Sequence, residues 1–135
     1  MLAPRFIDSN ILLYLFSSDE KKADKAEKAL AENSVINIQV LNEVTNVMRR
    51  KMKMSWDDIN EAQALIRSFC RIEPLTLEVH DRGKQIAERH QFSVYDSMIV
   101  AAALTARCEI LYSEGMQHKW SVELTLEIIN PFTPT

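Results

Sequence analysis

Hydrophobic residues recur along this chain with two different periods, which together predict short strands separated by helices. Apolar runs rich in β-branched residues predict strands, whereas apolar side chains three or four positions apart predict helices. The predicted strands are 5–8, 35–38, 71–73, 109–112 and 126–129. The predicted helices are 9–16, 19–32, 39–53, 55–69, 76–90 and 93–107.

Strands that alternate with helices predict an α/β fold, in which a parallel sheet of about five short strands carries helices on both faces. In open sheets of this kind, ligand sites form outside the carboxyl ends of the strands. A chain of 135 residues has the usual size of one domain. We therefore expect residues 1–135 to form a single domain.

The composition narrows the possible functions. With 47% hydrophobic and 26% charged residues, the chain has the composition of an ordinary soluble protein. Its longest nearly uncharged stretch, 92–106, is too short to cross a bilayer, and charges near the N-terminus interrupt any secretory signal, so we expect a cytoplasmic location. The only glycines are Gly83 and Gly115, which excludes the common glycine-rich phosphate-binding loops. The net charge of −3 gives no overall sign of nucleic-acid binding, and the basic cluster at 49–53 is equally well explained as a solvated helix end.

Three acidic residues occur where a hydrophobic core is expected. Asp8 and Asp96 each precede an apolar stretch, and Glu43 interrupts the apolar face of a predicted helix. Each also has an ordinary structural explanation. Asp8 can cap a helix, Glu43 can form a salt bridge, and Asp96 can complete a capping box with Ser93.

Taken together, the three acids favour a bound cation. Unpaired buried charges are costly, and neighbouring carboxylates raise each other's pKa unless a cation compensates. Oxygen ligands select hard cations such as Mg²⁺ or Mn²⁺, while the scattered cysteines and histidines argue against zinc. A site of this kind suits phosphodiester hydrolysis. Ser113 and Glu114 bring a further loop to the same edge, although they are also typical turn and exposed loop residues.

Five segments that span nearly the whole chain form an ordered set. They are FIDSNILLY (6–14), QVLNEV (39–44), YDSMIVAAA (95–103), LYSE with MQH (111–114 and 116–118) and NPF (130–132). Each motif is weak alone, but their order and spacing are specific. The set resembles the PIN-domain ribonucleases, and most closely the VapC-type toxins of toxin–antitoxin pairs.

This resemblance implies a three-layer α/β/α PIN-like fold and RNA cleavage that depends on Mg²⁺, with Mn²⁺ as a plausible substitute. It implies that Asp8, Glu43 and Asp96 are metal-binding and catalytic residues, and that Asn10 and Ser113 are polar supports for them. It further implies a homodimer and an antitoxin protein whose C-terminal part blocks the site.

The chain departs from the family pattern at one important position. The family commonly places a fourth acid where this chain has Gly115, and the adjacent Glu114 is our candidate for a catalytic substitute. We expect one metal ion bound by Asp8 and Asp96, with Glu43 nearby, and a second ion that is weakly held or absent. Activity is then reduced unless Glu114 replaces the missing acid.

Two alternative functions follow from these residues. The first is a non-catalytic PIN-fold module that binds RNA or a protein, which the glycine at position 115 favours. The second is a hard-metal phosphatase of the doubly wound type. Such an enzyme usually carries a second acid two residues after the first, and here Asn10 occupies that position after Asp8.

Overall fold

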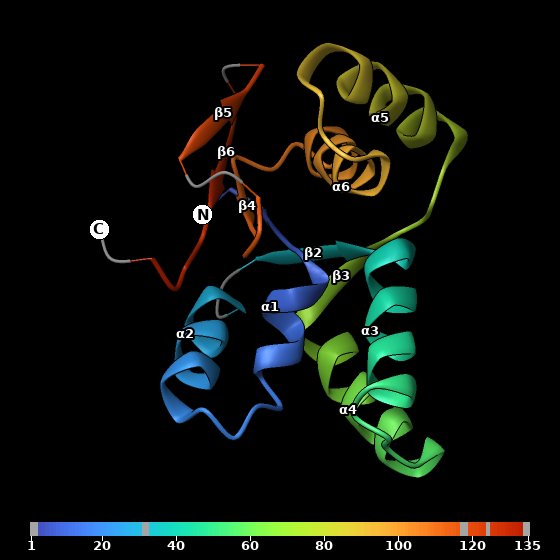
Figure 1. The fold of residues 1–135 in the computed structure, drawn as a ribbon, viewed down its shortest axis with the longest axis vertical. Coiled ribbons are helices and arrows are strands. Elements are labelled where there is room, and N and C mark those ends of the chain that lie inside the picture. The colour runs from blue at the N-terminus through green and yellow to red at the C-terminus, as the bar shows by residue number, and fades with distance from the viewer. Residues whose placement is uncertain (1–2, 31–32, 117–118, 124, 134–135) are drawn as a thin grey trace.

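The computed structural model describes the chain except for residues 1–2, 31–32, 117–118, 124 and 134–135. Its strands are β1 (Arg5–Ile7), β2 (Ser34–Asn37), β3 (Cys70–Glu73), β4 (Ile110–Tyr112), β5 (Trp120–Val122) and β6 (Leu126–Ile129). Its helices are α1 (Ser9–Tyr14), α2 (Glu20–Leu30), α3 (Ile38–Arg50), α4 (Trp56–Phe69), α5 (Leu77–His90) and α6 (Val94–Thr105). Figure 1 shows the sheet between two layers, with α5 and α6 on one face and α1 to α4 on the other.

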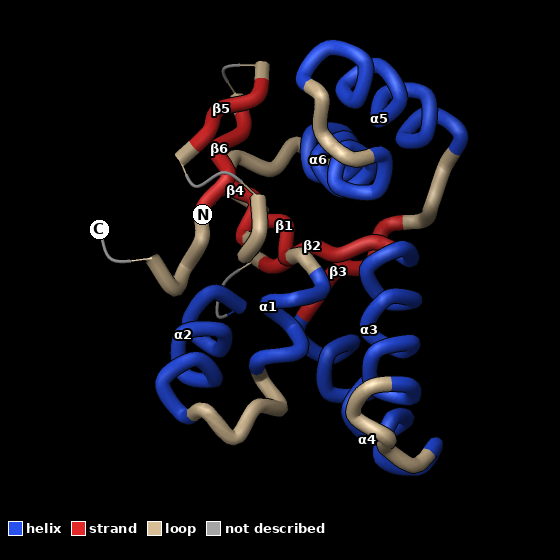
Figure 2. Tube along the Cα trace, in the orientation of Figure 1, coloured by secondary structure: helices blue, strands red, loops and turns tan. Residues whose placement is uncertain are grey.

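All six strands belong to one sheet, in the order β3-β2-β1-β4-β6-β5. Every pairing is parallel except that of β5 with β6, and Figure 2 shows the strands in red between the blue helices. The predicted α/β/α fold with a mainly parallel sheet is confirmed. The sequence analysis missed β5, because its residues Trp-Ser-Val form no apolar run and this strand depends on its hydrogen bonds to β6.

Helices α4, α5 and α6 begin where the capping residues of the sequence predicted, whereas α3 begins at Ile38, one residue before its predicted start. The hydroxyl oxygen of Ser55 accepts a hydrogen bond from the backbone N–H of Asp58, and that of Ser93 accepts one from Asp96, each at 3.1 Å. Thr76 caps α5 in the same way. Such caps satisfy N–H groups that the first turn leaves unpaired, so the helix starts follow from local sequence.

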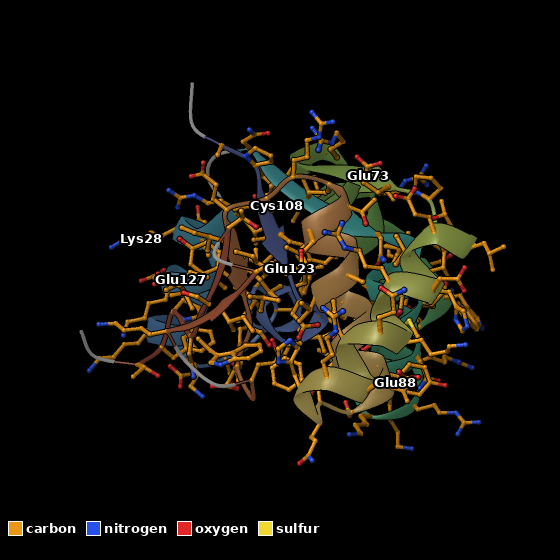
Figure 3. The ribbon with its side chains drawn as sticks, turned by 90° about the horizontal axis from the view of Figure 1, so that it is seen from above. Lys28, Glu73, Glu88, Cys108, Glu123 and Glu127 are labelled. Atoms are coloured by element: carbon orange, nitrogen blue, oxygen red, sulfur yellow. The ribbon has the colours of Figure 1, made fainter. Side chains whose placement is uncertain are left out.

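The most buried helix is α6, in which every residue from 97 to 104 is buried. It packs closely against α5, where a Cβ atom added to Gly83 would lie 2.5 Å from the Met98 sulfur. In Figure 3, seen from above, α6 runs through the middle of the molecule, with Glu88 of α5 on one side and Lys28 of α2 on the other. Tight packing on both faces fixes the position of the first turn of α6. None of the described helices has the length and apolar character needed to cross a membrane.

Candidate active site

Asp8 and Ser113 meet at the carboxyl edge of the sheet because β1 and β4 are parallel neighbours. Ile7 pairs with Tyr112 in this register, and the backbone N–H of Asp8 continues the ladder by donating to the Tyr112 carbonyl at 2.9 Å. The next residue, Ser113, donates its hydroxyl hydrogen to Asp8 Oδ2 at 2.7 Å. Both side chains are buried, with 6% of Asp8 and none of Ser113 exposed.

The carboxylate of Asp8 is held from both sides. Its Oδ1 accepts a hydrogen bond from the Ser9 N–H at 2.8 Å, so Asp8 also caps α1, as its ordinary structural explanation predicted. The pKa of Asp8 is raised from 3.8 to about 6, mainly by burial. The hydrogen bonds from Ser113 and Ser9 oppose this shift, and the negative charges of Glu43 and Asp96 contribute to it. The ionised form of Asp8 is therefore less stable here than a solvated carboxylate is, and a nearby cation would relieve that cost.

Glu43 lies next to Asp8 through a short series of polar contacts. Its Oε2 accepts from the Ser9 hydroxyl at 3.3 Å, and its Oε1 accepts from Gln39 Nε2 at 3.2 Å. Gln39 also donates to the Tyr95 carbonyl at 3.4 Å, which connects the beginnings of α3 and α6. Within the described residues no ion pair involves Glu43, so the salt-bridge explanation does not hold there.

Asp96 occupies the first turn of α6, where the partial positive charge of the helix N-terminus favours an acid. Ser93 caps this helix by accepting from the backbone N–H of Asp96. The Asp96 carboxylate is half-buried, and its charge contributes to the raised pKa of Asp8. The structure thus brings both Glu43 and Asp96 within electrostatic reach of Asp8.

Glu114 is also near this edge, but its carboxylate is engaged by other side chains. Tyr14 donates its hydroxyl hydrogen to Glu114 Oε1 at 2.6 Å, and Lys22 Nζ lies 3.5 Å from Oε2. Asn10 holds the Glu114 backbone, accepting from its N–H at 3.2 Å and donating to its carbonyl. Asn10 therefore contacts this loop rather than the other three acids, and Glu114 is a half-buried residue rather than an exposed one.

Gly115 has a conformational role that the sequence did not indicate. Its φ is +113°, in a region that residues with a side chain rarely adopt. A Cβ atom at this position would have no heavy atom within 4 Å, so the constraint comes from the backbone and not from crowding. The loop therefore favours glycine here in its present shape. Gln117 and His118, the last two residues of the MQH motif (116–118), lie outside the described residues.

The donor chemistry of the site fits a hard divalent cation. Within the described part of the chain, no three Asp, Glu, His or Cys side chains form a complete metal-binding group. Mg²⁺, however, commonly keeps several waters and uses only one or two carboxylates. The oxygen donors of Asp8 and Asp96, with the negative charge that raises the pKa of Asp8, match that requirement.

The fold and site define an α/β/α protein with clustered acids at the carboxyl edge of its sheet. A family model described as "PIN domain" matches residues 5–119, and the chain belongs to this family. Its fold is similar to that of Mycobacterium tuberculosis VapC20, described as a sarcin–ricin loop cleaving toxin, with a TM-score of 0.66 and 18% identity over 82% of this chain and 90% of that one. It is also similar to a chain of a toxin–antitoxin complex from Klebsiella pneumoniae, with a TM-score of 0.72 and 18% identity over 95% and 98%. No curated protein matches the sequence.

Proposed function

We propose that this protein is a metal-dependent endoribonuclease that acts as the toxin of a toxin–antitoxin pair. The observation that carries the proposal is the buried Asp8 carboxylate, held by Ser113 and influenced by the charges of Glu43 and Asp96. Membership of the PIN domain family supports it. A structural relative described as a sarcin–ricin loop cleaving toxin supports RNA as the substrate class.

In the proposed mechanism, each acid has a separate role. Asp8 and Asp96 would hold Mg²⁺ or Mn²⁺, with Glu43 nearby. A divalent ion polarises the scissile phosphate and lowers the pKa of the attacking water. Ser113 and the Ser9 N–H fix the direction of the Asp8 carboxylate. Glu43, held by Ser9 and Gln39, would accept a proton from the attacking water.

Removal of metal tests this function directly. We expect the protein to cleave single-stranded RNA in Mg²⁺ or Mn²⁺, to lose cleavage in excess EDTA and to recover it when either ion is restored in excess. Gel analysis of an end-labelled RNA measures the rate. RNA binding without cleavage in either ion would contradict the nuclease proposal and favour the non-catalytic PIN-fold module.

Gly115→Asp, compared with Gly115→Ala, tests the role of the missing acid. Both substitutions place a side chain at φ +113°, so we expect each to lower the free energy of unfolding by about 1–3 kcal/mol. If an acid at this position contributes to metal binding, the aspartate variant cleaves RNA faster than the alanine variant at the same Mn²⁺ concentration. Equal rates for the aspartate variant and the unmodified protein would show that the glycine costs no activity.

An apolar groove along α4, made of two pockets that share Leu65, supports the proposal of an antitoxin partner. One part of it, about 500 Å³, is lined by Leu15, Leu30, Leu65 and Phe69 with Glu27. A second part of about 480 Å³ shares Leu65, and its lining includes the acidic residues Asp58 and Glu61. Leu65 and Phe69 are about half exposed. Apolar walls with an acidic rim suit an amphipathic segment that carries basic residues, so we propose that the antitoxin binds here through such a segment.

Leu65→Asp is expected to weaken antitoxin binding at least about tenfold, because the loss of one buried leucine contact costs about 1.5–3 kcal/mol. Leu65→Met keeps the apolar volume and serves as the matched control, with affinity close to that of the unmodified protein. Isothermal titration calorimetry with the purified antitoxin measures both. An unchanged affinity for Leu65→Asp would place the antitoxin elsewhere.

We also propose that the protein is a homodimer and acts in the cytoplasm. Outside the groove, the large apolar side chains of Leu77 and Tyr95 are each 75% exposed, which provides further apolar surface for a contact between copies. Sedimentation equilibrium of the purified protein measures the mass in solution, and a monomer at micromolar concentration would contradict the proposed dimer.

A further inference from the structure

Lys22 places its ammonium beside the loop that carries Glu114. Ala26 follows Lys22 by four positions and is buried, so both residues lie on the inner stripe of α2. Lys21, Lys25 and Lys28 of the same helix are exposed, and Figure 3 shows Lys28 on the outer side of the molecule. The direction of Lys22 is therefore a consequence of the packing face of α2.

Aromatic and acidic groups hold the Lys22 ammonium in place. Its Nζ lies 3.1 Å from the Tyr14 hydroxyl, 4.5 Å from the centre of the Tyr14 ring and 5.4 Å from that of Phe132. The two rings pack edge to face at 4.8 Å. The hydrogen bond to Tyr14, with a contribution from the charge of Glu114, raises the pKa of Lys22 above its ordinary value. A lysine in this setting is positively charged and pre-positioned.

Helix α1 connects the Lys22 ammonium with the acidic site. Tyr14 follows Asp8 by six residues along α1, which corresponds to about 9 Å of helix. Asn10 and Tyr14 both bind Glu114, so Lys22 is connected to the edge of the sheet through two consecutive turns of α1. The substrate of the proposed reaction is a polyanion, and Asp8, Glu43 and Asp96 oppose its approach. A fixed cation beside the Glu114 loop offsets part of that repulsion.

The ion pair between Lys22 and Glu114 leaves the ammonium able to bind another anion. Its separation is 3.5 Å, and the two side chains are 36% and 32% exposed. Partly exposed pairs of this kind contribute little stability, so a phosphate can displace the carboxylate. Tyr14 retains its own hydrogen bond to Glu114 Oε1 when this happens.

We infer that Lys22 binds a backbone phosphate of the RNA beside the scissile one. This assignment rests on the proposed function, since it takes RNA as the substrate. The assignment can still be tested apart from RNA cleavage, because a phosphate contact affects RNA binding even where no cleavage occurs.

The salt dependence of RNA binding tests the assignment. Each phosphate contact to a single strand contributes a slope of about −0.7 to a plot of log affinity against log salt concentration. In an Asp8→Asn background, which prevents cleavage, Lys22→Met is expected to make the slope shallower by about 0.7. Lys28→Met is the matched control on the outer face, and Lys22→Arg and Tyr14→Phe keep the charge. All three are expected to retain the parent slope in fluorescence anisotropy with a short mixed-sequence RNA.

The outcomes separate this inference from the proposed function. Equal slopes for Lys22→Met and Lys28→Met overturn the Lys22 assignment, even if the unmodified protein cleaves RNA. A shallower slope for Lys22→Met alone supports it, even if the unmodified protein fails to cleave RNA in Mg²⁺ or Mn²⁺, which would reject only the nuclease proposal. A parent protein that binds no RNA at low salt overturns the Lys22 assignment.

Discussion

Asp8→Asn and Asp96→Asn are each expected to reduce RNA cleavage at least about 100-fold, because charge stabilisation by a bound metal is worth several kcal/mol. Each substitution removes a negative ligand and keeps the size of the side chain. Asparagine also remains a good helix cap at position 8, so the fold of α1 is preserved. Initial rates at saturating Mn²⁺ with an end-labelled RNA measure the effect.

Asp81→Asn is the matched control for these two variants. Asp81 is an exposed acid of α5, and its substitution makes the same change of charge away from the site. We expect its cleavage rate to equal that of the unmodified protein. If either Asp8→Asn or Asp96→Asn cleaved RNA at the parent rate while remaining folded by circular dichroism, the nuclease proposal would fail.

In metal-free buffer, the protein is expected to lose stability as the pH rises from about 4 to about 6. The native pKa of Asp8 is about 6, above the value of 3.8 for the unperturbed group. Between these two values the native state binds more protons than the unfolded state, so the free energy of unfolding falls with increasing pH. The shift of about two units corresponds to about 3 kcal/mol, which is fully lost above the native pKa.

Asp8→Asn removes this titrating group and with it most of the pH dependence. The variant is expected to be more stable than the unmodified protein at pH 7, by up to about 3 kcal/mol, and to differ little from it at pH 4. Urea unfolding at the two pH values, in EDTA, measures the difference. A difference in the free energy of unfolding that stays the same at pH 4 and pH 7 would show that burial does not raise the pKa of Asp8.

Metal should act in the opposite direction to high pH. The proposed cation would bind the native state and compensate the Asp8 charge, so Mn²⁺ is expected to stabilise the unmodified protein at pH 7. Asp8→Asn lacks that ligand, so we expect it to gain much less from the same concentration. This comparison examines the metal site without relying on cleavage.

The features that the sequence predicted correctly are those with local signals. Asp8 ends an apolar strand and begins a helix, and Asp96 follows the capping residue Ser93 by three positions. The sheet rule then assigns Ser113 to the same edge as Asp8, because each follows a parallel strand. For these residues, chain order and element type are sufficient to predict their neighbours.

The contacts of Glu114 were not predicted, because they depend on how α1 and α2 pack. Tyr14 lies 100 positions from Glu114 in the chain, and Lys22 lies 92 positions from it, so no local pattern connects them. The four-residue spacing from Lys22 to the buried Ala26 was a usable signal that this lysine faces inward. For Gly115, the sequence suggested a lost acid, whereas the backbone requires a residue that tolerates a positive φ.

The bond between Asp8 and Ser113 joins residues 105 positions apart. A ribosome adds about 5–20 residues per second, so about 5–20 s pass between the synthesis of Asp8 and that of its partner. During this time the nascent chain carries the first acid of the site without the strand that completes its surroundings. A protein built in this way acquires its site only late in its own translation, so the growing chain lacks the complete site throughout this interval.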